Sequence, residues 1–288
     1  MLAGASVVAT RFVIGETDPI TLAFCRFSIA SSCFLPFVIV AYRGKAVSAR
    51  DLAAIAALGI IFFGLFPWTF SASLNNTTAA RGAVGLSTMP IATLLLSVIF
   101  GRESLSLRSA ISVFLAFVGV SVAFGDALLS DSGSRDYLFG DALMLVTALI
   151  GAIYTVFAGP YLRRYGPLFV TGLAVILGAL ALATLNLMIG NLKEFPQFST
   201  NGWAAVLFLG TGGGAIQFML YTWPLRWISP TRVALFLTLA PISAMLLASV
   251  ILGEQLTVWL VVGLTLVLAA IFVANARHFV RRPALQQE

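Results

Sequence analysis

Apolar runs of about 20 residues recur along the chain, and each is long enough to cross a hydrocarbon core about 30 Å thick as an α-helix. A transmembrane β-barrel would instead show strands of about ten residues with alternating apolar and polar positions. The pattern therefore predicts an all-α protein. Its spans are expected near residues 1–15, 20–42, 52–73, 78–100, 107–125, 139–161, 166–189, 202–223, 230–252 and 256–276.

Short polar segments separate these spans, among them Arg43-Gly44-Lys45, Asn75-Asn76 and the stretch from Asp126 to Asp136. The first span is the shortest, because only about 14 residues precede Glu16, or about 21 Å of helix. Either this helix is partly submerged or the natural chain begins upstream of Met1, and we favour the second interpretation.

The composition identifies the medium in which these helices lie. The chain is 60% hydrophobic and 10% charged, whereas a soluble domain carries roughly 25% charged residues. We therefore expect an all-α integral membrane protein. Cys25 and Cys33 fall in one apolar run, so we expect two small apolar side chains rather than a disulfide or a metal site.

The net charge of +6 is interpreted as a topology signal, because the basic residues lie in short loops and form no groove for nucleic acid. With a cytoplasmic N-terminus, ten spans place twelve of the 17 Lys and Arg residues on the cytoplasmic side. The positive-inside rule therefore predicts that both termini are cytoplasmic.

One spaced pattern of scarce residues occurs twice, displaced by 151 residues at every position. The two copies are Arg81, Pro90, Glu103 and Leu105, and Arg232, Pro241, Glu254 and Leu256. The chain is therefore expected to contain two copies of one unit. Five spans per copy is an odd number, so the second copy must insert upside down, as in secondary transporters with inverted repeats.

These repeats divide the chain into four parts. We expect a first repeat at 1–125, a connecting loop at 126–138, a second repeat at 139–276 and a basic cytoplasmic tail at 277–288. The fold class is thus ten transmembrane helices arranged as two inverted five-helix repeats.

Several segments resemble the drug/metabolite transporter superfamily, whose bacterial EamA-type members carry one signature in both halves. The first copy runs from Ala72 to Leu105, with Pro90 in mid-helix and Gly101-Arg102-Glu103 after it. The second contains Leu239-Ala240-Pro241 and Leu252-Gly253-Glu254. The opening Gly4-Ala5-Ser6 is also similar to that of the family. The resemblance implies ten helices, a central cavity between the halves, and export or exchange of small metabolites, often amino acids.

Pro90 and Pro241 fall in the middle of the fourth and ninth spans, where a proline removes one backbone hydrogen bond. It also frees the carbonyl four residues earlier, here that of Leu86 in the first copy. A static kink is one interpretation. We favour a break that lines the cavity or flexes as a hinge, because both copies have it.

Glu103 and Glu254 end the same two spans, just before Ser106 and Thr257, whose hydroxyls can cap the next helix. A carboxylate near a helix N-terminus is favourable by about 0.3–1 kcal/mol. We therefore expect a structural role for both carboxylates rather than proton coupling.

Arg81 and Arg232 begin these spans, where the helix dipole opposes a cation. We expect both at the mouth of the cavity. Each could extend its side chain to the membrane interface or recognise a carboxylate of the substrate. The same two interpretations apply to Arg26.

The cavity itself is inferred from polar and aromatic residues at mid-membrane depth. Gln217 lies near the centre of a span, where an amide without a partner costs several kcal/mol, so it needs a protein or substrate partner. Aromatic side chains with a few hydrogen-bonding groups are typical of a small-molecule site. The candidate substrate-binding residues are Thr10, Phe62, Phe66, Trp68, Ser87, Tyr154, Gln217, Tyr221, Phe236 and Thr238.

The charge distribution narrows the function. No Asp, Glu, Lys or His falls in the central third of any expected span, and intramembrane carboxylates are the usual proton relays and cation partners. The substrate is therefore expected to be neutral or zwitterionic. Neither a Ser-His-Asp set nor a metal-ligand group is available with one histidine outside the membrane, so we expect no enzyme, no metal and no cofactor.

Together with the resemblance, these features predict a secondary transporter of the bacterial cytoplasmic membrane that works by alternating access. Its substrate would be a small metabolite such as an amino acid, and its direction export. A translocase for a lipid-linked carrier and a membrane protein without transport activity are the alternatives. Its partners would be the substrate and the lipid bilayer but no nucleic acid, and it could be a monomer or a dimer.

Overall fold

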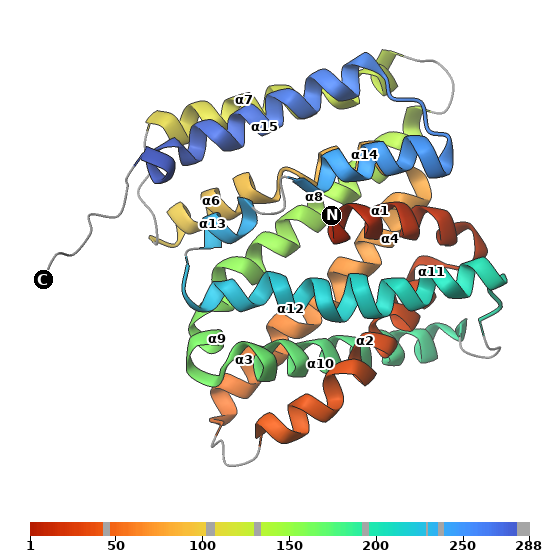
Figure 1. The fold of residues 1–288 in the computed structure, drawn as a ribbon, viewed down its shortest axis with the longest axis vertical. Helices are drawn as coiled ribbons and strands as arrows, with labels where there is room; N and C mark the ends of the chain where they lie inside the picture. Colours follow the sequence, from red (N-terminus) through yellow and green to blue (C-terminus); the bar gives the residue numbers. More distant parts are fainter. Residues whose placement is uncertain are drawn as a thin grey trace, which may run out of the picture.

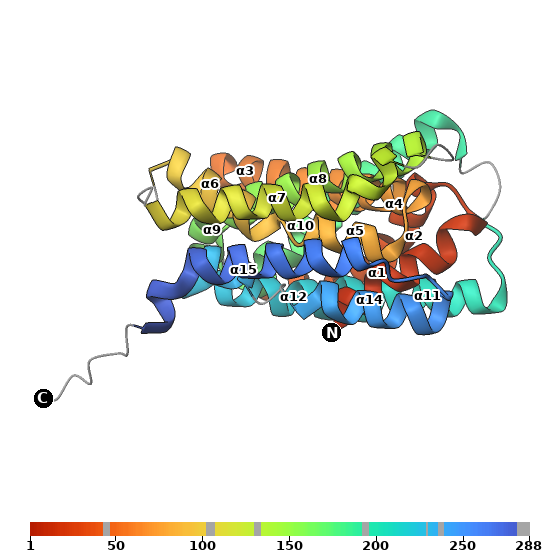
Figure 2. The same ribbon diagram turned by 90° about the horizontal axis from the view of Figure 1, so that it is seen from above.

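The computed structural model describes residues 1–42, 47–101, 107–129, 134–191, 196–228, 230–235 and 239–280. These ranges are almost entirely helical and contain no strand. Six of their helices are long and apolar enough to cross a membrane, and three shorter apolar helices accompany them. The chain is thus an all-helical protein of the membrane-spanning class. Most helices run roughly along one direction in Figures 1 and 2.

The first half begins with the 12-residue helix α1, followed by the 24-residue helix α2. Next come α3, the π-helical segment η2 and α4, which together form one continuous helical stretch from residue 49 to residue 76. The bounds are α1 Leu2–Val13, η1 Ile14–Glu16, α2 Pro19–Tyr42, α3 Ala49–Gly59, η2 Ile60–Leu65, α4 Phe66–Asn76, α5 Ala79–Leu86, α6 Met89–Ile99 and α7 Leu107–Leu129.

The second half has a similar order of elements, again with a π-helical segment, η4, inside one long stretch. The bounds are α8 Ser134–Phe157, α9 Gly159–Tyr165, α10 Pro167–Ile189, α11 Thr200–Gly210, η4 Thr211–Ile216, α12 Gln217–Thr222, η5 Trp223–Arg226, α13 Pro230–Leu235, α14 Leu239–Leu252 and α15 Val258–Val280.

Helices of the two halves pack in corresponding pairs. α7 lies beside α15 along one edge of the bundle, and α2 packs against α10 (Figure 1). α1 contacts α14 while α8 contacts α6, and α5 contacts α14 while α13 contacts α6. If α1, α5 and α14 correspond to α8, α13 and α6, the contacts that α14 makes with the first half have counterparts in those that α6 makes with the second half.

The two π-helical segments occupy corresponding positions, because η2 starts at Ile60 and η4 starts 151 residues later at Thr211. In each, the first residue after the segment bonds five residues back: the amide of Phe66 donates to the carbonyl of Ile61, and that of Gln217 to that of Gly212. Such local widening of a helix is rare and frequently occurs at functional sites.

The fourth span is broken into two helices rather than kinked at Pro90. α5 ends at Leu86, and Pro90 lies in the first turn of α6, where a missing amide proton costs no helical hydrogen bond. The hydroxyls of Ser87 and Thr88 donate to the carbonyls of Val84 and Gly85, at 2.6 and 2.7 Å. In the ninth span the structure describes α13 up to Leu235 and α14 from Leu239.

The described helices overlap the expected spans, with differences at their ends. The connecting loop predicted at 126–138 is shorter, because α7 continues to Leu129 and α8 begins at Ser134. The sixth span ends at Phe157, and the separate helix α9, opened by Gly159 and Pro160, follows it. The tail predicted from residue 277 begins later, because α15 continues to Val280.

Candidate functional site

A cavity lies where helices of both halves meet. The first half contributes residues from α1, α2, η2, α4, α5 and α6, and the second half contributes residues from α12 and α14. The lining residues are Ala3, Ser6, Val7, Arg26, Phe62, Phe66, Phe70, Ala83, Leu86, Ser87, Met89, Gln217, Phe218, Tyr221, Ala240 and Pro241.

One end of the cavity is polar and is organised around Gly213 of η4. The hydroxyl of Ser6 donates to Oε1 of Gln217 at 2.9 Å, and Nη2 of Arg26 donates to the carbonyl of Gly213 at 2.7 Å. A Cβ atom on Gly213 would lie 2.3 Å from Oγ of Ser6. A side chain at this position would therefore displace the hydroxyl of Ser6, which the glycine allows to lie close to η4.

The remaining wall is aromatic. Phe62 packs edge-on against Phe66 and Phe218, with ring centroids 5.1 and 5.4 Å apart, and Phe66 stacks on Phe70 at 6.0 Å. Rings held by several neighbours give a stiff apolar surface. Tyr221 completes this wall, and its hydroxyl is 2.6 Å from Oγ1 of Thr155.

Three pairs of lining residues are separated by the same 151 residues as the sequence repeat. Phe66 corresponds to Gln217, Phe70 to Tyr221 and Met89 to Ala240, and all six line the cavity. Residues of the two π-helical stretches and of α6 and α14 at corresponding positions thus line one space.

Six of the predicted site residues lie together on this lining: Phe62, Phe66, Ser87, Gln217, Tyr221 and Pro241. Five others, among them Arg81, are described but lie elsewhere. Tyr154 stacks behind Phe62 at 4.2 Å, and Thr10 is buried in α1. Trp68 lines a shallow groove on the outside of α4 together with Leu65 and Ala181, and Pro90 lies in the first turn of α6 beside the lining residue Met89.

The remaining candidates fall outside what the structure describes. Phe236 and Thr238 lie between the described ranges, as does Glu103, and of Arg232 only the backbone of α13 is described. Their proposed roles stay predictions.

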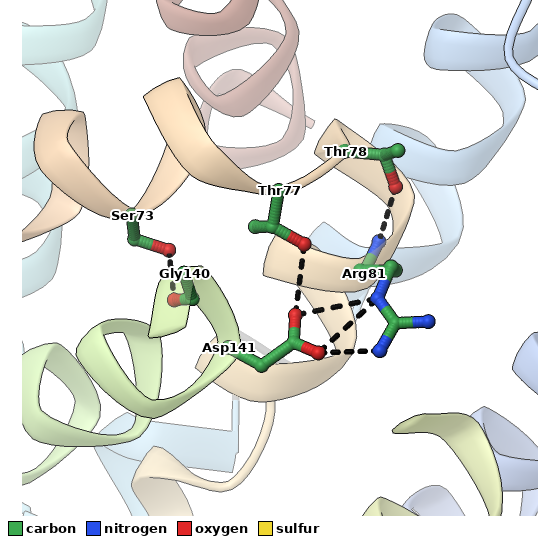
Figure 3. Close-up of polar contacts among 6 residues, drawn as sticks. All are labelled: Ser73, Thr77, Thr78, Arg81, Gly140 and Asp141. Atoms are coloured by element: carbon green, nitrogen blue, oxygen red, sulfur yellow. Dashed lines mark hydrogen bonds and ion pairs between the residues drawn. The ribbon is translucent and has the colours of Figure 1, made fainter. Parts of the chain in front are cut away.

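Arg81 is buried and is not one of the residues that line the cavity. It is 5% exposed, and its Nη2 and Nε atoms face the carboxylate of Asp141, with Nε 3.2 Å from Oδ2 (Figure 3). Oγ1 of Thr77 donates to Oδ1 of the same carboxylate at 2.8 Å, and the hydroxyl of Thr78 caps α5. Arg81 thus ties the start of α5 to α8, across the two halves.

Glu254 also has a structural role, but it contacts the start of α5 rather than the helix that follows it in the sequence. Its carboxylate oxygens accept hydrogen bonds from the amides of Ala79 and Ala80, at 2.9 and 3.0 Å, which satisfies two free donors at the start of α5. Thr257 does cap the helix that follows, since its hydroxyl oxygen accepts from the amide of Leu260 at 3.3 Å.

Among the polar and aromatic side chains of the lining, the sequence did not point to Ser6, Phe70 and Phe218, and it left Arg26 open between snorkelling and recognition of a carboxylate. Two signals were available. Arg26 is a charge inside the apolar second span, and Phe70 precedes the candidate Tyr221 by the repeat distance of 151 residues.

An all-helical bundle with several apolar spans, two π-helical segments at corresponding positions and a cavity between its halves is the architecture of a multi-pass membrane transporter. Residues 1–125 and 138–276 match the EamA-like transporter family, and the chain belongs to that family.

Known proteins of similar length support this assignment. A protein of Archaeoglobus fulgidus named an uncharacterized transporter is 28% identical over 94% of this chain and 93% of its own length. YyaM of Bacillus subtilis, also named an uncharacterized transporter, is 21% identical over 94% of this chain and 89% of its own length. One solved structure has a TM-score of 0.67 at 20% identity and covers 96% of the chain, a likeness of fold alone.

Proposed function

We propose that this protein is a secondary transporter that moves a small neutral or zwitterionic metabolite, such as an amino acid, out of the cell through the central cavity. The observation that carries the proposal is the lining of one cavity by corresponding residues of both halves. A site between two related halves can be exposed to either side of the membrane when one half rocks against the other.

In this proposal the chain crosses the membrane ten times as two inverted repeats. The paired helix contacts and the matching positions of η2 and η4 support it. The break between α5 and α6 resembles the discontinuous helices that many transporters place at their binding sites. The glycine pair Gly59 and Gly210, also 151 residues apart, supports it further, because each lies against the backbone of a neighbouring helix.

Gln217 is the first side chain to test. Gln217→Leu should leave the protein folded, because leucine suits the membrane interior, yet it should lower transport at least tenfold by removing the amide that Ser6 contacts. The measurement is exchange of radiolabelled amino acids and other small neutral metabolites in proteoliposomes.

The matched control is Leu220→Ala, on the same helix but 64% exposed on the outside of the bundle. This variant should transport at the wild-type rate. Unchanged transport by Gln217→Leu would reject the site, and a wild-type protein that exchanges no compound of the panel would reject the function.

The proposed orientation, with both termini in the cytoplasm, places Arg163 of α9 inside and Asn201 of α11 outside. Both residues are exposed. Single cysteines at these positions, in a background with Cys25→Ala and Cys33→Ala, are expected to react differently with an impermeant maleimide on intact cells. Asn201→Cys should be labelled at once and Arg163→Cys only after permeabilisation; the opposite result would reject the orientation.

A further inference from the structure

We propose that Arg26 binds a carboxylate group of the substrate at the polar end of the cavity, so that the transported molecule carries an anionic head and an apolar body. The inference rests on the proposed function, whose substrate class it narrows.

Arg26 is a buried charge that faces the cavity without an anionic partner. It is 4% exposed, and its Nε atom has no hydrogen-bond partner. Nη2 donates to the carbonyl of Gly213, and the guanidinium lies 5.3 and 5.9 Å from the ring centroids of Phe27 and Phe218. Among the described residues, no carboxylate lies within ion-pair distance of it.

Such an arrangement is costly unless something else compensates the charge. A buried ion without a partner loses several kcal/mol of hydration, and buried charges in proteins are therefore paired or bind ions. A guanidinium presents its donors in a fork that matches a carboxylate, which makes a carboxylate the best fit for the remaining donors.

The position of Arg26 has a counterpart in the other half, and that counterpart is not charged. A Cβ atom on Gly59 would lie 2.7 Å from the carbonyl oxygen of Ala174, and one on Gly210 would lie 3.0 Å from that of Arg26. Because Gly59 and Gly210 correspond in the repeat, Ala174 and Arg26 occupy corresponding places. The same helix packing is thus made with an alanine, so packing does not require an arginine at this position.

Other corresponding positions around the cavity also carry different types of residue in the two halves. Gly213 and Gln217 of the second half stand where the first half has Phe62 and Phe66. The corresponding positions therefore give a polar end with Arg26, Ser6 and Gln217, and an aromatic wall with Phe62 and Phe66. A molecule that is charged at one end and apolar at the other matches both surfaces.

A purely structural role is the competing explanation, because the bond from Arg26 to the carbonyl of Gly213 also stabilises the π-helical segment η4. Loss of that support would weaken binding of every ligand alike. Loss of a carboxylate-binding group would instead remove a preference between two ligands of the same shape.

The experiment measures the affinity of the purified protein for three matched pairs of carboxylate and amide: 3-phenylpropanoate, hexanoate and L-leucine, each with its primary amide. Wild-type protein should bind at least one carboxylate ten or more times more tightly than its amide. In Arg26→Gln this ratio should fall close to one. Arg26→Lys should keep part of it, because lysine retains the charge but not the fork.

The matched control is Arg11→Gln, another arginine that donates to a backbone carbonyl, that of Leu74 at 2.8 Å, but outside the cavity lining. It should keep the wild-type ratio. If Arg26→Gln does not fold, the inference is tested by the carboxylate-to-amide affinity ratios of the wild-type protein and of Arg26→Lys.

Two results would overturn the inference: wild-type protein that binds no carboxylate of the set or binds the amides equally well, and an Arg26→Gln variant that keeps the preference. Exchange of a neutral compound that depends on Gln217 but not on Arg26 would leave the proposed function standing while rejecting the role of Arg26.

Discussion

Arg81→Met is expected to destabilise the protein by about 3–5 kcal/mol, the usual cost of removing one partner of a buried ion pair. The carboxylate of Asp141 is almost fully buried, at 2% exposure, and it would lose the guanidinium that faces it. The hydrogen bond that Thr77 donates to this carboxylate is neutral, and it is worth less than the charge-assisted contact with Arg81.

The double variant Arg81→Met with Asp141→Asn should be more stable than Arg81→Met alone. Asparagine removes the second charge while its carbonyl oxygen can still accept the bond from Thr77. A double-mutant cycle in detergent, with thermal loss of the monodisperse protein as the readout, gives the coupling energy between the two residues. Additive effects of the two single changes would show that the pair is not coupled, contrary to the geometry in Figure 3.

This pair and the contact of Glu254 with the start of α5 join residues of the two halves at one end of the bundle. In the orientation that we propose, that end faces outward. An alternating-access cycle would therefore have to separate the Arg81–Asp141 pair, the Glu254 contact or both whenever the cavity opens to the outside.

Much of the fold follows from local properties of the sequence, because each span is a run of apolar residues that must satisfy its backbone within one helix. The apolar run near 166–189 became α10 at Pro167–Ile189 for that reason. Helices extend into both ends of the segment 126–138, because its polar residues do not prevent helix formation: α7 continues to Leu129 and α8 begins at Ser134.

The site was only partly predictable. Phe66 and Gln217 could be found because each lies in mid-span and both belong to the repeat. The partner of Arg81 could not be found, because Asp141 lies 60 residues away and no local pattern links the two. Arg26 was visible as a charge in an apolar run, but only the packing of α2 against η4 shows that it faces the cavity.

The π-helical segments also lacked a common sequence signal. The second contains Gly212, Gly213 and Gly214, whereas the first reads Ile60 to Leu65 with a single glycine. Their shared geometry comes from the packing around them, where α10 lies against η2 and α2 against η4.

Close packing of the same helices gives the last expected result: Gly59→Ala should destabilise the protein by about 1–3 kcal/mol, the usual cost of overpacking. The new Cβ atom would lie 2.7 Å from the carbonyl oxygen and 2.8 Å from Cα of Ala174. Both are backbone atoms of α10 and cannot rotate away, so α3 would have to move off its neighbour. Small residues are what allow two membrane helices to approach this closely.

The control lies five residues further along the same helical stretch. A Cβ atom on Gly64 would be 3.7 Å from its nearest neighbour, the carbonyl oxygen of Gly178, which is ordinary contact. Gly64→Ala should therefore be neutral or stabilise by up to about 1 kcal/mol through its better helix propensity. Thermal unfolding of the two variants side by side in detergent measures the difference. Equal stability would mean that α3 and α10 are not in backbone contact at Gly59. It would also remove the evidence that Ala174 and Arg26 occupy corresponding positions in the two halves.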